Sequence, residues 1–507
     1  MQTGDVKVTQ QNLKSTVLVL GDQINRDIAS LSGRSPADTR ILFIELSAKF
    51  GKKQWHKQKV HLLLSAMMHF AKELRDEGFE VDYREAKTLL DGIEAHTREF
   101  EVSHIVAMEP MNWNGRNLLE KLNIELIRNN QFLCHYEDFA NWSSEKGKFK
   151  MEDFYRWQRK RLNILMDGSD PCGGKWNFDH ENRERPPRDG REWPSITLFE
   201  HDDIDDQIIK NLDSFWGAYP KGVWPVTRKQ ALIRLNEFVT GALTAFGPYE
   251  DAMLGKEWKL AHSVLSSCLN IGLLHPSEVV DAVEVAYLNG DAPINSVEGF
   301  IRQVIGWREY VWGLYWLWMP EYRSENFLEA NRIIPPAFLE KNATEMACIH
   351  GAVEHLYEFA YTHHIERLML FGNLSLTSGL DPQKVTDWMW SRFIDGAEWV
   401  MIPNVIGMAT FADGGKMATK PYASGGAYVN RMSDYCSDCV YDPKKRTGDD
   451  ACPFTTLYWD FLDRNQELLS GNPRMGQQFG GLRRLSDLPE VRIRATEVLA
   501  KLDEGTL

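Results

Sequence analysis

The stretch "STVLVLGDQIN", residues 15–25, decides the fold of the N-terminal part of this chain. It is a short β-branched run that ends in polar turn residues, which is typical of a buried strand followed by a loop. Amphipathic helical patterns, such as "HLLLSAMMHFAKELRDEG" at residues 61–78, alternate with further runs of this kind. The further runs lie at residues 39–46, 79–86 and 102–110. Such alternation predicts an α/β domain with a doubly wound parallel sheet over residues 1–135.

Two regions of different composition follow. Residues 136–225 are rich in Gly, Pro and charge, as in "ENRERPPRDGREWP", and we expect them to form a long linker that carries a helix near residues 150–166. From residue 226 to residue 507 nearly every pattern is helical, which predicts an all-α domain. A doubly wound sheet offers a crevice at the carboxyl ends of its strands. No G-x-G-x-x-G follows any strand, so the sequence does not support a standard dinucleotide site.

The composition narrows the class of protein. The chain has 507 residues, 43% of them hydrophobic and 26% charged, which is ordinary for a globular protein of two or three domains. A net charge of −14 argues against nonspecific coating of nucleic acid, although it is compatible with a local basic groove. No apolar run reaches the ~18 residues that a membrane helix needs, and residues 1–20 lack a secretory signal pattern. We therefore expect a cytoplasmic protein with no membrane partner.

Three cysteines stand close together in "DYCSDCVYDPKKRTGDDACPF", residues 434–454, with the spacing C-x2-C-x12-C-P. Seven cysteines in a reducing compartment predict no disulfide framework. Two cysteines at C-x2-C can ligate one metal centre, and proline after the last cysteine recurs in iron–sulfur loops. Zinc would accept the same ligands, and unliganded buried cysteines are a third interpretation. The expected fourth ligand is Cys348, because Cys134 and Cys172 lie in the other half of the chain.

Two segments of the helical half suit a cofactor. The helix "GFIRQVIGWREYVWGLYWLW" (299–318) either packs in the core or flanks a planar aromatic group. In "HSVLSSCLNIGLL" (262–274), Ser263 and Ser266 stand at an expected helix N-terminus. They could hold a pyrophosphate there, and simple N-capping is the alternative.

Further residues also allow two interpretations. The neighbours His363 and His364 cannot share one helix face, so one of them can point into a pocket while the other packs. Trp388 and Trp390 either fill the core or relay electrons. Residues 156–191 and 413–446 carry more Lys and Arg than Asp and Glu, which indicates a DNA-facing surface or solvated loops.

Several longer motifs together resemble one known family. "GWREY", "HHIERLM", "WVMIPNVIGMATFADGG", "TKPYASGGAYVNRMSDYC" and the final C-x12-CPF resemble the bacterial cryptochromes and (6-4) photolyases that carry an iron–sulfur cluster. "VLGDQ" and "GGKWNFDHENR" fit the same group, so the resemblance spans nearly the whole chain. It implies the photolyase/cryptochrome fold, with an antenna domain at residues 1–135, a linker at 136–225 and an all-helical FAD-binding domain at 226–507.

The resemblance also implies three cofactors. A [4Fe–4S] cluster is expected on Cys348, Cys436, Cys439 and Cys452, which decides between iron–sulfur and zinc. FAD is expected with Arg308 and Asp395 beside its isoalloxazine and Asn404 at its N5 edge. The other expected FAD-binding residues are Phe246, Gly247, Ser263, Leu265, Ser266 and Gln303. A 6,7-dimethyl-8-ribityllumazine antenna is expected near Asp22, Glu45 and Glu109.

The activity that the resemblance implies is light-dependent repair of (6-4) pyrimidine–pyrimidone photoproducts in UV-damaged DNA. Excited reduced FAD would pass an electron to a flipped-out lesion, and His364, beside His363, would donate a proton. Tyr422, Asp179, Arg183 and Met408 are expected at the lesion, and Lys416, Lys420 and Arg431 at DNA phosphates. Photoreduction of FAD would begin at Trp388, with Trp390 as a further step. We expect a monomer that associates with the nucleoid when it binds DNA.

Three other functions fit parts of the same pattern. A blue-light photoreceptor cryptochrome without repair activity would use the same flavin and cluster. A cyclobutane-dimer photolyase is disfavoured by the histidine pair. A zinc-stabilised nucleic-acid-binding protein would carry neither flavin bands nor the broad cluster absorption near ~400 nm.

Overall fold

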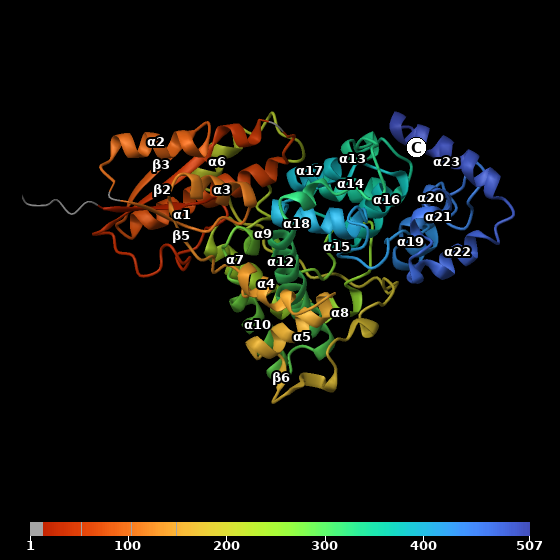
Figure 1. Ribbon diagram of the computed structural model, residues 1–507, viewed down its shortest axis with the longest axis horizontal. Helices are drawn as coiled ribbons and strands as arrows, with labels where there is room; N and C mark the ends of the chain where they lie inside the picture. Colours follow the sequence, from red (N-terminus) through yellow and green to blue (C-terminus); the bar gives the residue numbers. More distant parts are fainter. Residues whose placement is uncertain (1–13, 52, 103, 149) are drawn as a thin grey trace, which may run out of the picture.

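The computed structural model describes residues 14–51, 53–102, 104–148 and 150–507. In Figure 1 the sheet, coloured red and orange, lies at one end of the molecule, and the blue C-terminal helices lie at the other end. The expected first domain starts at residue 1, and its residues 1–13 lie outside the described part. Among the described residues, no helix combines the length and the apolar composition that crossing a bilayer requires.

The N-terminal sheet has five parallel strands in the order β3-β2-β1-β4-β5. The strands are β1 (Ser15–Val19), β2 (Thr39–Leu46), β3 (Glu80–Ala86), β4 (Ile105–Met108) and β5 (Glu125–Ile127). The strand order reverses between β1 and β4, and doubly wound sheets bind ligands at such a switch point. The parallel sheet confirms the fold class expected from the alternating pattern.

Helices cover both faces of this sheet because its central strands are apolar on both sides. Val17 and Val19 of β1 pack towards α1 (Lys57–Asp76), where Leu62, Ala66 and Phe70 meet them. Leu18 points to the other face, towards α2 (Leu89–Glu99) and α3 (Trp113–Lys121). The three-layer arrangement leaves the carboxyl ends of the strands as the open edge of the domain.

The region expected as a linker contains more regular structure than the single helix near residues 150–166 that the sequence indicates. It holds α4 (Tyr136–Ser144), α5 (Met151–Leu162), α6 (Asp203–Ile209) and the short strands β6 (Met166–Asp167) and β7 (Asp170–Pro171). Helices α4 and α5 pack against the helical domain, whereas α6 packs on α1. The segment therefore contacts both halves of the molecule, and the boundaries at residues 135/136 and 225/226 stay predictions.

The remaining helices form the C-terminal part (Figure 1). They are α7 (Arg228–Glu237), α8 (Leu243–Tyr249), α9 (Ser266–Asn270), α10 (Pro276–Leu288), α11 (Ile294–Ile301), α12 (Glu309–Trp318), α13 (Pro336–Leu339), α14 (Ala347–Phe359), α15 (His364–Glu366), α16 (Asn373–Ser378), α17 (Pro382–Arg392), α18 (Glu398–Ile402), α19 (Gly426–Met432), α20 (Pro453–Arg464), α21 (Gln466–Leu469), α22 (Gly476–Leu482) and α23 (Leu488–Glu504).

Four π-helical segments interrupt these helices: η4 (Phe238–Ala242), η5 (Arg302–Arg308), η7 (Arg367–Gly372) and η8 (Pro403–Ala409). A π-helical turn inserts an extra residue into an α-helix and is frequently found at functional sites. Residues expected at the flavin or the lesion, such as Gln303, Asn404 and Met408, lie on these segments.

Candidate active site and cysteine site

Three histidines meet beside α15. Nε2 of His262, from the loop before α9, lies 3.2 Å from Nδ1 of His364. The rings of His262 and His363 stack with their centroids 4.6 Å apart. His363 is fully buried, whereas 51% of the His364 side chain is exposed. The adjacent histidines therefore point in different directions, and His364 is the one that an incoming group can reach.

The hydrogen-bond partners of His262 decide which of its nitrogens carries hydrogen. Nδ1 of His262 lies 3.0 Å from the carbonyl oxygen of Lys259, which can only accept a hydrogen bond. Burial lowers the pKa of His262 to about 3, so the ring is neutral at ordinary pH. A neutral ring with hydrogen on Nδ1 has a lone pair on Nε2. His262 therefore accepts a hydrogen bond from Nδ1 of His364.

The other nitrogen of His364 faces a carboxylate. Nε2 of His364 lies 3.5 Å from Oδ1 of Asp251. Burial by itself would raise the pKa of Asp251, but the contact with His364 outweighs it and the pKa is lowered. Both ring nitrogens of His364 thus face acceptors. A ring with hydrogen on both nitrogens satisfies both contacts, which suits a proton donor.

Charged residues extend this site from Asp251. Nε of Arg183 lies 4.0 Å from Oδ2 of Asp251, and its Nη2 lies 3.4 Å from Oδ2 of Asp179. Asp179 also accepts a hydrogen bond from Arg302. The structure therefore connects Arg183 to His364 through Asp251, and Asp179 to Arg183, although these residues come from different segments.

Tyr422 lies near Arg183 and Asp179. The other residues expected to contact DNA have separate surroundings. Burial raises the pKa of Tyr422, and Arg474, Arg183 and Asp179 are the charges that act on it. Arg431 stacks its guanidinium 5.5 Å from the ring centroid of Tyr428. Met408 and Lys420 are half-buried. Lys416 forms an ion pair with Glu325, so a phosphate contact at Lys416 would require that pair to open.

A second polar network surrounds Asp395. Ser266 donates a hydrogen bond to Oδ2 of Asp395 (2.6 Å), and Nη1 of Arg367 donates to Oδ1 (2.9 Å). Nδ2 of Asn270 donates to the backbone oxygen of Asp395 (2.8 Å). Burial alone would raise the pKa of Asp395, but Arg367 and Ser266 lower it. Asp395 is therefore an ionised carboxylate that joins α9 to η7.

The four cysteines expected as cluster ligands line one small pocket. Cys348 comes from α14, Cys436 and Cys439 from the loop after α19, and Cys452 from the residue before α20. Burial, reinforced by the three neighbouring cysteines, raises the pKa of Cys348. A Cβ atom at position 426 would come 2.7 Å from Sγ of Cys452, so the close approach of α19 requires Gly426.

The other cysteines lie away from this pocket. Cys134 and Cys268 are buried in other apolar clusters, and Cys172 is half-buried in the linker. All seven cysteines are unpaired.

Comparison with known proteins identifies the family of this chain. A family model described as deoxyribodipyrimidine photo-lyase-related protein matches residues 17–219. A (6-4) photolyase from Agrobacterium fabrum (strain C58 / ATCC 33970) is 40% identical over 97% of this chain and 100% of its own length. The chain belongs to the (6-4) photolyase family.

Solved structures with low sequence identity show the same fold. A bacterial class III photolyase from Agrobacterium tumefaciens matches with a TM-score of 0.60 and 14% identity, over 99% of this chain and 100% of its own. A cryptochrome from Synechocystis sp. PCC6803 matches with a TM-score of 0.55 and 12% identity, over 83% of this chain and 88% of its own. The photolyase/cryptochrome fold implied by the resemblance is confirmed.

Arg308 and Asp395, both expected beside the flavin, have different protein partners in the structure. Nη1 of Arg308 bonds to Oε1 of Glu309 (2.9 Å), and its guanidinium lies 4.0 Å from the ring centroid of Phe132. Arg308 is the last residue of the π-helical segment η5, and its side chain faces Phe132, in the segment before α4. Arg367 is the arginine that pairs with Asp395.

The place beside Asp395 nevertheless fits a bound polar group. Both ring nitrogens of His363 and Nη2 of Arg367 are buried without a hydrogen-bond partner among the described residues. Buried polar groups normally have partners, so these atoms indicate a ligand that supplies donors and acceptors. The phosphates, ribityl hydroxyls and ring edge of FAD have suitable groups.

The other expected FAD-binding residues lie around this place with local partners. Gln303 donates to the oxygen of Gly299 (3.1 Å), and Asn404 to that of Val400 (2.8 Å). The Ser263 hydroxyl accepts the N–H of Leu265 (3.4 Å), and Leu265 is the N-cap residue of α9. Phe246 packs on His262 with ring centroids 5.8 Å apart. Gly247 packs too closely on α11 for a Cβ, which would lie 2.7 Å from Cα of Ser296.

The two expected electron-transfer residues pack against different neighbours. Trp388 is buried and stacks on Phe338, with ring centroids 5.0 Å apart. Trp390 packs instead on Trp55 and beneath Lys53, towards the N-terminal domain. Residues two apart on α17 point to different faces of the helix, which explains the different neighbours, and a role of these two rings in electron transfer stays a prediction.

The expected antenna residues lie at the carboxyl edge of the sheet. Asp22 follows β1 and Glu109 follows β4, on either side of the switch point, whereas Glu45 lies on β2 and accepts a hydrogen bond from Tyr83 (2.9 Å). Burial would raise the pKa of Glu109, but hydrogen bonds from His135 and Tyr136 hold it at about 2. Its carboxylate is therefore already engaged by the chain.

Sequence reasoning missed Asp251, His262 and Arg367 as functional residues. The available signals were weak: an acidic pair in "FGPYEDAM" and single basic side chains in "HSVLSS" and "HHIERLM". Their roles depend on neighbours that are distant in sequence, such as His262 and His364, which are 102 positions apart.

Proposed function

We propose that this chain repairs (6-4) pyrimidine–pyrimidone photoproducts in DNA in a light-dependent reaction. The observation that carries the proposal is the environment of His364. The side chain is half-exposed, and its two nitrogens face His262 and Asp251. Arg183 contacts Asp251, and Asp179 contacts Arg183, so these side chains can position a lesion that has left the base stack.

The proton transfer follows from the hydrogen bonds of His364. Nδ1 of His364 keeps its hydrogen throughout, because His262 offers only an acceptor there. The transferable hydrogen is therefore the one on Nε2, which faces Asp251. After donation, the ring is neutral with hydrogen on Nδ1, and Nε2 is free to be protonated again.

FAD is the cofactor that this site would hold, and when bound it supplies the photoexcited electron that starts repair. Arg367 and His363 would bind it through their buried polar atoms that lack partners, and Ser266, which donates to Asp395, would lie beside it. Asp395 keeps Arg367 in place through the 2.9 Å hydrogen bond. Phe246 and the close packing at Gly247 would exclude water from one side.

We propose contacts with UV-damaged DNA at Tyr422, Met408, Lys420 and Arg431, which lie on the segments around this site. The chain carries a net charge of −14, so binding depends on where these cations lie rather than on overall charge. Trp388 would begin photoreduction of the flavin, because it is the buried expected tryptophan.

We further propose a [4Fe–4S] cluster on Cys348, Cys436, Cys439 and Cys452. A zinc ion with Zn–S bonds of ~2.3 Å draws its sulfur ligands to about 3.8 Å from one another. Among the described residues, the one group of three potential ligands whose atoms all lie within 4.8 Å of one another does not include these cysteines. The wider spacing supports a cluster of several iron atoms, which would tie the loop after α19 to α14 and α20.

A 6,7-dimethyl-8-ribityllumazine antenna at the switch point is proposed with Asp22 as its nearest residue. Glu109 would act through its hydrogen bonds to His135 and Tyr136, which shape the crevice, and Glu45 lies one strand further out. We propose that the protein works as a monomer in the cytoplasm and at the nucleoid, since one chain holds the whole site and its cysteines are unpaired.

The decisive experiment uses an oligonucleotide with a single (6-4) photoproduct. Reduced holoprotein under blue light should convert the lesion to two pyrimidines, measured by liquid chromatography, and should leave it unchanged in the dark. A protein that binds flavin, bleaches and recovers under light but never repairs the lesion would instead be a photoreceptor.

A further inference from the structure

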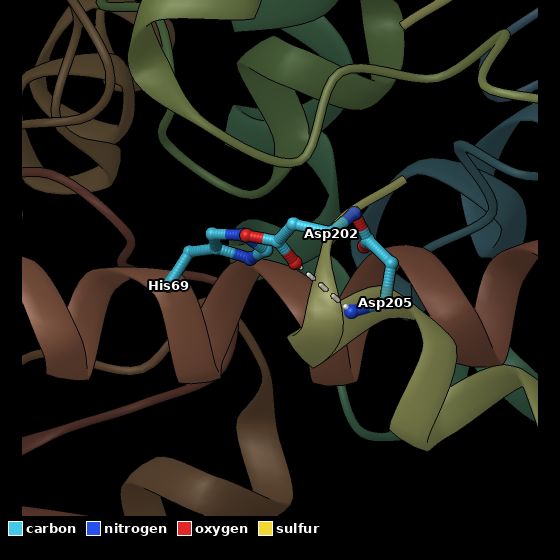
Figure 2. Close-up of side chains that lie close together, drawn as sticks. All are labelled: His69, Asp202 and Asp205. Atoms are coloured by element: carbon cyan, nitrogen blue, oxygen red, sulfur yellow. Dashed lines mark hydrogen bonds and ion pairs between the residues drawn. The ribbon is translucent and has the colours of Figure 1, made fainter. Parts of the chain in front are cut away.

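A cluster of histidine and carboxylate side chains lies far from the histidines of the active site. His69, on α1, reaches towards Asp202 and Asp205, which flank the start of α6 (Figure 2). One potential ligand atom from each of the three lies within 4.8 Å of the other two. His69 is partly exposed, Asp202 is exposed and Asp205 is buried, so an ion can enter from solvent.

Each carboxylate divides its two oxygens between different tasks. Oδ1 of Asp202 accepts the backbone N–H groups of Ile204 and Asp205, and Oδ2 of Asp205 accepts that of Asp202. These bonds form the capping box of α6. The remaining oxygens are Oδ2 of Asp202, 3.0 Å from Nε2 of His69, and Oδ1 of Asp205.

The hydrogen bonds of His69 leave its outer nitrogen as a ligand. Nδ1 of His69 lies 2.8 Å from the backbone oxygen of Ser65, which can only accept, so Nδ1 carries hydrogen. Nε2 is then the nitrogen that faces Oδ2 of Asp202, and it can act as a metal ligand. Metal-bound histidines usually donate their second N–H to a backbone carbonyl or a carboxylate in this way. A cation between the two groups satisfies both.

A buried histidine beside the cluster contacts one of its carboxylates without a well-aligned hydrogen bond. His61 also lies on α1. It is 4% exposed, and its Nε2 makes no well-aligned hydrogen bond. That atom lies 3.0 Å from Oδ1 of Asp205. Ser65 also donates a hydrogen bond to this oxygen. Ser65 and His61 thus form the outer support that carboxylate ligands of metals commonly have.

We propose that His69, Asp202 and Asp205 bind a divalent transition-metal ion of the zinc class, with water completing the coordination. Two carboxylates and an imidazole suit zinc and its neighbours better than calcium, which takes oxygen ligands. The ion connects α1 of the sheet domain to α6 of the linker. It therefore fastens the chain that joins the two halves of the protein, independently of the repair chemistry.

The test measures metal content in holoprotein that carries no histidine tag. After dialysis against micromolar zinc chloride, zinc, iron and flavin are counted for each chain. We expect one more zinc in the unchanged protein than in His69→Ala or Asp202→Asn. Asparagine is as good a helix cap as aspartate, so Asp202→Asn removes the charged ligand while α6 keeps its cap. Ser65→Ala should weaken zinc binding roughly 10-fold.

His104→Ala is the matched control, because His104 forms a 2.7 Å contact with Glu125 on the same domain without a second carboxylate. It should bind as much zinc as the unchanged protein. Zinc should also slow proteolytic cleavage near residue 200 in the unchanged protein but not in Asp202→Asn. Absence of bound zinc, equal zinc in all these variants, or zinc that disappears only in Cys439→Ser would overturn the proposal.

Discussion

Nε2 of His262 lies 3.2 Å from Nδ1 of His364, and it faces that atom as an acceptor because Nδ1 of His262 is turned to the oxygen of Lys259. Burial lowers the pKa of His262 to about 3, so the acceptor is not lost to protonation at the pH of a cell. One neutral histidine thereby fixes which hydrogen of its neighbour can be transferred.

Replacing His364 by alanine should remove the proton donor. Repair of a (6-4) lesion should fall by roughly 10²- to 10⁴-fold, the usual contribution of a general acid. Flavin content should stay the same, since His364 is half-exposed and its neighbour His363 remains. Repair is measured as light-dependent loss of the lesion at saturating DNA. His104→Ala, which changes a remote exposed histidine, is expected to repair at the original rate.

Replacing His262 tests the acceptor. His262→Ala leaves Nδ1 of His364 without its partner, and repair should fall about 10-fold, the value of one ordinary hydrogen bond. His262→Gln places an amide oxygen near the position of Nε2 and should recover part of that loss. Equal loss in both variants, together with lost flavin, would show that His262 only supports the fold.

The sequence predicts the sheet and the helices well because these elements depend on local patterns. The run at residues 15–25 and its successors alternate with helices, and the parallel sheet follows from that alone. The site depends on contacts between distant positions, which such patterns do not contain. Asp179 and Arg302 meet across 123 positions. The π-helical turn in η5 also shifts the direction of Arg308, and no periodicity of 3.6 residues anticipates that shift.

Asp395 should be needed to keep the flavin. Asp395→Asn keeps the size of the side chain but removes the partner of Arg367, whose guanidinium is mostly buried. Breaking a buried ion pair on one side costs roughly 3 kcal/mol. The ratio of flavin to protein, read from absorption after gel filtration, should therefore fall. Arg308→Gln is the comparison. It disturbs the pair with Glu309 and leaves Asp395 and Arg367 unchanged, so the folded variant should keep its flavin.

The four cysteines of the pocket should hold iron. Cys439→Ser should lower the iron content and the broad absorption near ~400 nm, because one cluster ligand is lost. Cys134→Ser, which changes a buried cysteine in another apolar cluster, should keep the iron. Purified protein with one zinc at these cysteines and no iron would contradict the cluster.

Glu250 should make stability fall as the pH rises. Burial, with Asp251, Asp179 and Glu298 nearby, raises its pKa from 4.5 to about 8 despite the pull of Arg302. Between about pH 5 and pH 8 the carboxyl group is protonated in the folded chain and ionised in the unfolded chain. The folded state then binds more protons, so the free energy of unfolding decreases with rising pH across this window. The decrease amounts to roughly 4 kcal/mol at most.

Glu250→Gln is neutral at every pH and should remove this dependence. The midpoint of thermal unfolding of each protein is measured at pH 5 and at pH 8. The midpoint of Glu250→Gln minus that of the unchanged protein should be larger at pH 8 than at pH 5. Glu94→Gln serves as the control, because Glu94 lies on α2 with 53% of its side chain exposed and should leave the dependence as it was. If Glu250→Gln follows the unchanged protein across the whole window, the carboxyl group is already ionised at pH 5. In that case Arg302 outweighs the burial of Glu250 in the folded protein.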